Sequence, residues 1–175
     1  MLRRCLVLSV RDIQENSLIV TLVHPQLGKQ EFLAKGGKRI AAKLTPWLGP
    51  LQLVNVWVAS TRGTRAIIRE VESLENLAPS GPLGLRLSLK IAALLEKALL
   101  PGVEIEPFFE RVIVILRHVQ KPHTSLEELK KLWIQFELLL LSFLGVAPPL
   151  EHLKGKNVNE ASRFLAQRID YFFSS

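Results

Sequence analysis

The sequence predicts an α+β protein in which a small closed β-barrel of five strands precedes an α-helical domain. Three observations carry this prediction. Short β-branched runs fill the chain before Leu77. Two prolines and two glycines in residues 77–84, LAPSGPLG, are typical of a junction. Beyond it, apolar residues recur with the period of a helix. We therefore expect a barrel domain over residues 1–78 and a helical domain over residues 79–175.

The strands are predicted from runs rich in Val, Ile, Leu and Phe that alternate with polar turns. Five short strands are too few for the usual two-sheet sandwich, whereas closing them into a barrel removes exposed edges. The expected strands are CLVLSV, SLIVTLV, KQEFLA, LQLVNVWVAS and TRAIIREV, with RDIQEN, QLGK and STRGT as the first, second and last turns.

The helices are predicted from apolar stripes and capping signals. Residues 82–100 are rich in Leu and Ala, and Pro107 suits the first turn of the next helix. Thr124 and Glu127 have capping-box spacing, Gly145 is an expected helix end, and residues 157–160 offer a further cap. The expected stripes are Ile105, Phe108, Phe109, Val112, Leu116 and Val119; then Leu129, Leu132, Trp133, Phe136, Leu140 and Phe143; and finally Phe164, Leu165, Ile169 and Phe172.

Composition excludes several protein classes. Apolar residues make up 48% of the chain and charged residues 22%, which indicates a folded core rather than disorder. Cys5 is the only cysteine, so no internal disulfide forms. No apolar run has the length of a membrane span. We interpret MLRRCLVLSV as the first strand of a cytoplasmic, nucleoid-associated protein rather than a signal peptide, and we expect no membrane partner.

The positive charge is confined to the first third of the chain. Residues 1–65 hold ten Lys and Arg against three acids, which accounts for the whole formal net charge of +7. A local positive field of this kind attracts polyanions, nucleic acid first. A basic surface kept for solubility is the plainer alternative.

No catalytic constellation is evident. Gly37 and Lys38 resemble the end of a phosphate-binding loop, but Arg39 stands where that motif needs Ser or Thr. The four histidines are scattered, and acid pairs near helix starts fit the helix dipole. We therefore expect no enzyme, no metal site and no cofactor.

Residues 35–43 are the best candidate site. Gly36 and Gly37 would let a backbone approach closely, and the cations around them would meet phosphates. Trp47 is a candidate for stacking on bases, whereas the alternation around Trp57 favours packing on a core face or against the helical domain. The predicted DNA-binding residues are Lys35, Lys38, Arg39 and Lys43, with Arg4, Arg11, Arg62 and Arg65 extending the track.

These segments resemble the RecO family of bacterial recombination mediators. Residues 34–39, AKGGKR, resemble the family's A-K-G-x-[KR]-R segment. LTPWLGPLQLVNVWV and RAIIREVE resemble its following strands, and residues 136–150, from Phe136 to Leu150, resemble its F-E-x-x-L-L-x-x-L-G-x-x-P-x-L segment. The chain is shorter than common members, and it lacks the four-cysteine zinc motif that many members carry.

The resemblance implies an N-terminal OB-fold barrel, binding of single- and double-stranded DNA, and annealing of complementary strands. It also implies help in loading RecA, with RecR and the acidic C-terminal tail of single-strand-binding protein as partners. Lys35, Lys38 and Arg39 are then the first DNA-binding candidates. His152, Lys154 and Lys156 could hold the acidic tail, but a solvated loop is the plainer explanation.

Two other functions fit the residues. In the first, the basic barrel serves as a protein-interaction module that docks an acidic peptide such as the tail of single-strand-binding protein. In the other, the barrel binds RNA. Composition does not separate these from DNA binding.

Overall fold

The computed structural model describes residues 1–14, 17–35, 45–59, 65–122 and 124–174. Residues 1–78 and 88–109 form one compact unit, and residues 79–87 and 110–175 form a second. The chain thus leaves the first unit after Ala78, where the sequence predicts a boundary, but residues 88–109 belong with the barrel. The helices α2 (Pro82–Ala98) and α3 (Glu106–Gln120) each run from one unit into the other.

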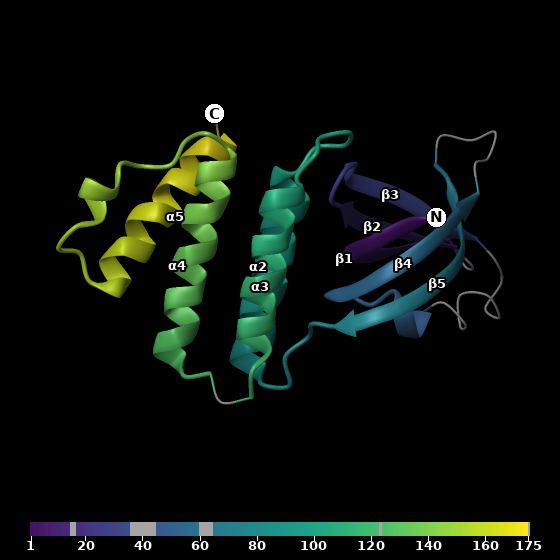
Figure 1. The fold of residues 1–175 in the computed structure, drawn as a ribbon, viewed down its shortest axis with the longest axis horizontal. Coiled ribbons are helices and arrows are strands. Elements are labelled where there is room, and N and C mark those ends of the chain that lie inside the picture. Colours follow the sequence, from purple (N-terminus) through teal and green to yellow (C-terminus); the bar gives the residue numbers. More distant parts are fainter. Residues whose placement is uncertain (15–16, 36–44, 60–64, 123, 175) are drawn as a thin grey trace. The chain divides into compact units, whose positions relative to one another are not determined.

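Five strands close into a barrel in the order β1-β2-β3-β5-β4 (Figure 1). All neighbours are antiparallel except β3 and β5, which pair in parallel through Leu33 and Ile67. This arrangement confirms the predicted five-stranded OB-fold barrel. The strands are β1 (Leu2–Gln14), β2 (Ser17–His24), β3 (Gly28–Lys35), β4 (Gln52–Ala59) and β5 (Ile67–Asn76), with a short 3-10 helix, η1 (Thr45–Trp47), before β4.

Alternate residues of the strands fill the barrel interior. Buried aliphatic side chains from all five strands pack there around Phe32, because successive side chains of a strand point to opposite faces. Cys5 lies in this core, and burial raises the pKa of its thiol to about 12, so the single cysteine is neutral and inert. The buried members are Cys5, Val7, Val20, Leu22, Phe32, Ala34, Leu48, Val54, Val56 and Ile68.

Two strands are longer than the sequence indicates. The polar residues Arg11 and Asp12, expected in a turn, extend β1 because they pair with Ile19 and Leu18 of β2. Strand β5 likewise continues to Asn76. Cross-strand pairing, which hydropathy does not record, decides both lengths.

The turn between β2 and β3 is joined to the segment after α2. The backbone N–H of Lys29 donates to the Leu100 carbonyl at 3.2 Å, that of Gly102 donates to Leu27 at 2.8 Å, and that of Ile105 donates to Pro25 at 2.7 Å. Gly28 sits at the centre with a φ of +62°. A Cβ atom there would clash with the Leu100 carbonyl oxygen and lie 2.8 Å from that of Val103. Only glycine fits both demands.

The second unit contains two cap-defined helices, α4 (Leu126–Phe143) and α5 (Val158–Ser174), which lie side by side (Figure 1). The cap before α5 is confirmed, because Asn157 and Glu160 exchange side-chain-to-backbone hydrogen bonds at 3.0 Å. A short 3-10 helix, η2 (Leu150–Leu153), follows α4 and precedes α5 in the chain.

The capping box of α4 is one residue later than predicted. Ser125, not Thr124, caps the helix, and its partner is Glu128. Thr124 instead donates to the carbonyls of His118 and Lys121. The hydrogen bonds from the Ser125 backbone and side chain lower the pKa of Glu128. They therefore stabilise the fold above the usual carboxyl pKa, and this contribution is lost as the pH falls through the lowered value.

The end of α4 is confirmed at Gly145. This residue has a φ of +73°, its N–H donates to Ser142, and that of Val146 donates to Leu141. The pair of bonds forms a Schellman motif, in which a glycine in the left-handed region ends the helix.

The predicted apolar stripes are confirmed in α3 and only partly in the later helices. All six predicted residues over 105–119 are buried. In α4, Leu132 and Phe143 are half-exposed while Leu141 and the fully buried Glu137 replace them. In α5 the buried residues are Ala161, Leu165 and Ile169, so Phe164 and Phe172 lie on its margin.

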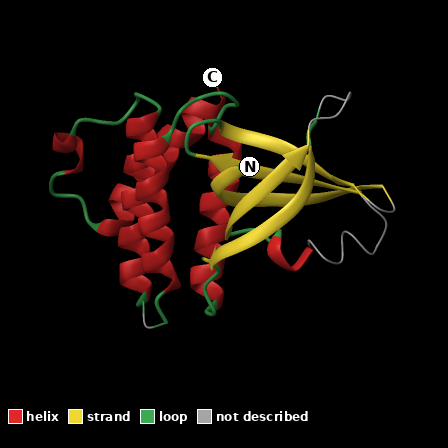
Figure 2. Cartoon of the chain, turned by 45° about the vertical axis from the view of Figure 1, so that its right-hand side comes forward, coloured by secondary structure: helices red, strands yellow, loops and turns green. Residues whose placement is uncertain are grey.

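Figure 2 separates the strands from the helices by colour. Within the described residues, no helix is long and apolar enough to cross a membrane.

We predict that Gly28→Ala lowers the free energy of unfolding by about 2–4 kcal/mol, because the added methyl group meets backbone carbonyls and the φ is left-handed. Gly102→Ala is the matched control, since Gly102 has a φ of +75° but open space around its Cβ position. It should cost about 1–2 kcal/mol. Urea unfolding of both variants measures the difference, and equal losses would show that the tight contact at Gly28 does not matter.

Candidate nucleic-acid interface

The strand register brings cations to one outer surface of the barrel. Ile19 of β2 pairs with Arg11 of β1 and with Leu33 of β3. Because the neighbours of Ile19 and Leu33 along each strand belong to the core, these side chains point outward. Lys35 follows Leu33 on the same face of β3 and pairs with Ser17. We call the surface formed by Arg11, Ile19, Glu31, Leu33, Lys35 and Arg65 the basic face.

Two arginines of the basic face share one carboxylate. The Arg11 guanidinium donates to Glu31 Oε1 at 2.8 Å. The Nε and Nη2 atoms of Arg65 lie 3.0 and 2.9 Å from Glu31 Oε2. Arg65 reaches this position because the N–H of Leu33 donates to the carbonyl of Ala66, which aligns the start of β5 with β3. Arg11 and Arg65 therefore meet at the Glu31 carboxylate, although they lie 20 and 34 positions from Glu31 in the chain.

The remaining members make the basic face suitable for a polyanion. Lys35 is exposed, and Ile19 and Leu33 form a half-exposed apolar strip between the cations. Three cations against one acid leave a net charge of +2. Phosphates would meet the cations, while the apolar strip offers contact to sugars or bases.

Helix α2 covers another part of the outer surface of β1, β2 and β3. Ser9 and Thr21 donate to the Glu96 carboxylate of α2 at 2.9 and 3.3 Å. Lys29 donates to the Glu96 carbonyl at 2.6 Å. The second half of α2 therefore occupies this part of the outer surface, whereas the basic face stays exposed.

Arg4 does not join the basic face. It lies seven residues before Arg11 on the same strand, about 23 Å along an extended chain. Its φ is +55°, and it lies where the β1–β4 pairing is irregular. Its backbone N–H donates to the side-chain oxygen of Asn55. Of the described candidates, Arg11, Lys35 and Arg65 come together, whereas Arg4 lies apart from them.

Several predicted residues lie outside the described part of the chain. Gly36, Gly37, Lys38, Arg39, Lys43 and Arg62 all fall in residues 36–44 or 60–64. Their roles stay predictions.

The two candidate tryptophans differ in exposure. Trp47 is 47% exposed in η1, so its ring has the accessibility that stacking requires. Trp57 is half-buried and points out of the barrel, because Val56 and Val58 on either side pack with its core. Trp57 therefore does not pack on the core face, and its packing against the helical domain stays a prediction.

Sequence reasoning did not identify Glu31 as a functional residue. A signal was present: Glu31 is one of three acids in the basic first third, and it alternates with Leu33 and Lys35 on β3. The ion pair between Glu31 and Arg65 could not be predicted from the sequence pattern, because it depends on barrel closure between β3 and β5.

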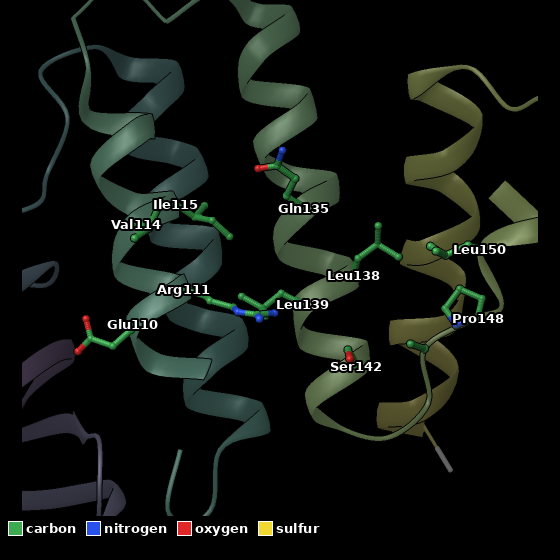
Figure 3. A pocket seen from close by; sticks show the side chains of 11 residues that line it. Glu110, Arg111, Val114, Ile115, Gln135, Leu138, Leu139, Ser142, Pro148 and Leu150 are labelled. Atoms are coloured by element: carbon green, nitrogen blue, oxygen red, sulfur yellow. The ribbon is translucent and has the colours of Figure 1, made fainter. Parts of the chain in front are cut away.

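The second unit carries an apolar groove with a volume of about 700 Å³ (Figure 3). Side chains of α3, α4 and residues 147–150 line it. Arg111 extends across the groove toward α4, whereas Glu110 points away from it (Figure 3). The main apolar lining residues are Val114, Ile115, Leu138, Leu139, Pro148 and Leu150.

The fold and the basic face define an OB-barrel protein with a candidate polyanion-binding surface and an attached helical unit. Residues 1–77 match the family model described as Recombination protein O N terminal. The resemblance to RecO proteins is thus supported for the barrel.

Curated relatives are similar to more of the chain. The DNA repair protein RecO of Vibrio atlanticus (strain LGP32) is 27% identical over 158 residues, covering 88% of this chain and 62% of that protein. Those of Vibrio cholerae serotype O1 (strain M66-2) and Vibrio vulnificus (strain CMCP6) are 26% and 25% identical over 155 residues, covering 88% of this chain and 62% and 61% of theirs. The chain thus spans about three-fifths of the length of these relatives.

Proposed function

We propose that this chain binds DNA through the basic face and acts in recombinational DNA repair without making or breaking covalent bonds. Phosphates of a single strand would lie across Arg11, Lys35 and Arg65, and Lys38, Arg39, Lys43 and Arg62 would extend the contact. Neutralising phosphate charge on two strands lowers their repulsion, which is the step that annealing needs.

The observation that carries the proposal is the convergence of Arg11, Lys35 and Arg65 on an exposed outer surface of β1, β2 and β3. The outer face of strands 2 and 3 is also where OB barrels bind oligonucleotides. The relatives named DNA repair protein RecO support the repair role.

The finer parts of the proposal rest on the similarity to RecO proteins. They are binding of double-stranded DNA, annealing of complementary strands, and loading of RecA together with RecR on DNA covered by single-strand-binding protein. The chain matches only 62% of the length of its relatives, so each of these activities needs its own assay on this chain.

The second candidate function is the docking of an acidic peptide, such as the tail of single-strand-binding protein. The groove of the second unit favours it, because an apolar lining beside the Arg111 guanidinium suits a peptide that carries both acidic and apolar side chains. Docking there would be independent of the basic face.

We predict that a labelled single strand binds with a log–log salt slope of about −3 to −4.5, as expected for four or five phosphate contacts. Lys35→Glu combined with Arg39→Glu should weaken binding of all sequences at least tenfold, because phosphate contacts carry no sequence information. Fluorescence anisotropy across a salt series measures both effects.

The matched control is Arg86→Glu combined with Arg163→Glu, which changes the net charge equally at two exposed positions of the helices. This control should retain most of the affinity. Salt-independent binding, or an equal loss in both double variants, would contradict DNA binding at the barrel.

A labelled acidic peptide separates the two functions. If it binds in the groove, Arg111→Gln should weaken the peptide at least threefold, and an unlabelled oligonucleotide should not displace it. If it binds on the barrel, the oligonucleotide should compete and Arg111→Gln should have no effect. Anisotropy of the labelled peptide reports both cases, and no binding at low salt would remove the peptide function.

A further inference from the structure

Glu31 is held by two guanidinium groups at once. One carboxylate oxygen accepts from Arg11 at 2.8 Å, and the other accepts from Arg65 at 3.0 and 2.9 Å. All three side chains stay accessible, with exposed fractions of 34% for Glu31, 56% for Arg11 and 44% for Arg65. A solute can therefore reach both guanidiniums without opening the barrel.

The geometry suits more than one kind of oxyanion. A carboxylate and a phosphodiester each present two oxygens that share one negative charge at a similar spacing. The guanidinium fork binds either of them through paired N–H groups. Arg11 and Arg65 are thus already placed around an anion of the shape that a DNA backbone carries.

The two arginines gain more from a DNA phosphate than from the Glu31 carboxylate. Exposed ion pairs are weak, so losing the contacts to Glu31 costs little. A phosphate of a polyanion also releases condensed counterions when a cation neutralises it, and a single carboxylate has no such contribution. Strand binding can therefore displace Glu31 from the arginines.

We propose that Glu31 is an internal substitute for a backbone phosphate, which occupies Arg11 and Arg65 in the free protein and is displaced by the strand. The inference rests on the proposed function and deepens it. Glu31 is in this role a positioning residue: it keeps the two guanidiniums at the spacing that a phosphate needs, and it lowers the affinity by competing for them. A static link between β3, β1 and the start of β5 is the alternative role.

The first test is Glu31→Gln, which keeps the shape and removes the charge. The variant should bind a labelled single strand about two- to tenfold more tightly at low salt, with a salt slope steeper by about 0.7. The matched control is Glu70→Gln, an exposed acid five residues after Arg65 on the barrel. This control loses the same charge and should change the affinity less than twofold.

A second comparison locates the effect. In a background of Arg11→Gln and Arg65→Gln, Glu31→Gln should give no gain, because the groups it competes for are absent. A gain that persists in this background would overturn the proposal. So would a Glu31→Gln variant that binds equally or more weakly than wild type, since a static link predicts a lower melting temperature without tighter binding.

A DNA-free probe keeps this inference separate from the proposed function. Tripolyphosphate added to the wild-type protein should shift the Nε–Hε NMR signal of Arg65, and Glu31→Gln should strengthen the interaction at least twofold. If oligonucleotides fail to bind any variant while tripolyphosphate behaves in this way, the proposed function fails, and Glu31 is shown to compete with a polyphosphate for Arg11 and Arg65. An unperturbed Arg65 signal would overturn the role of Glu31, even if Glu31→Gln does not fold.

Discussion

The parallel contact between β3 and β5 is the constraint on which the site depends. Among the described residues, the register pair of Leu33 with Ile67 and the hydrogen bond from Leu33 to Ala66 join strands that are separated by η1 and β4 in the chain. Closure removes the last free edges of the sheet. It also brings Arg65 to Glu31 and therefore to Arg11, so the same contact that completes the barrel assembles the basic face.

Helix α2 covers one part of the outer surface of β1, β2 and β3 and leaves the basic face exposed. Glu96 of α2 accepts hydrogen bonds from Ser9 and Thr21, and its carbonyl accepts one from Lys29. These polar contacts fix the second half of α2 on one part of the strands. The other part keeps its cations in solvent, where a long polyanion can lie across several strands. A rigid barrel thus presents charges at fixed positions, which lowers the entropic cost of binding.

Much of this fold could be predicted because its signals are local. β-branched runs, a Pro- and Gly-rich junction and helical stripes predict the barrel and the helices, and Asn157 with Glu160 forms the cap that their spacing indicates. The capping box at Ser125 was missed by one residue because two adjacent pairs have the required spacing. They are Thr124 with Glu127 and Ser125 with Glu128. The grouping of Arg11 with Arg65, the separation of Arg4 and the role of Glu31 depend on register and closure, which no local pattern records.

The central claim is that a single strand lies on the basic face. Its most direct test is backbone NMR mapping of the ¹⁵N-labelled protein with an oligothymidine added stepwise at low salt. The account predicts that amide shifts concentrate at Arg11, Ile19, Leu33, Lys35 and Arg65, while signals of α4 and α5 stay unchanged. Shifts confined to the helices of the second unit, with none on β1, β2 and β3, would contradict it.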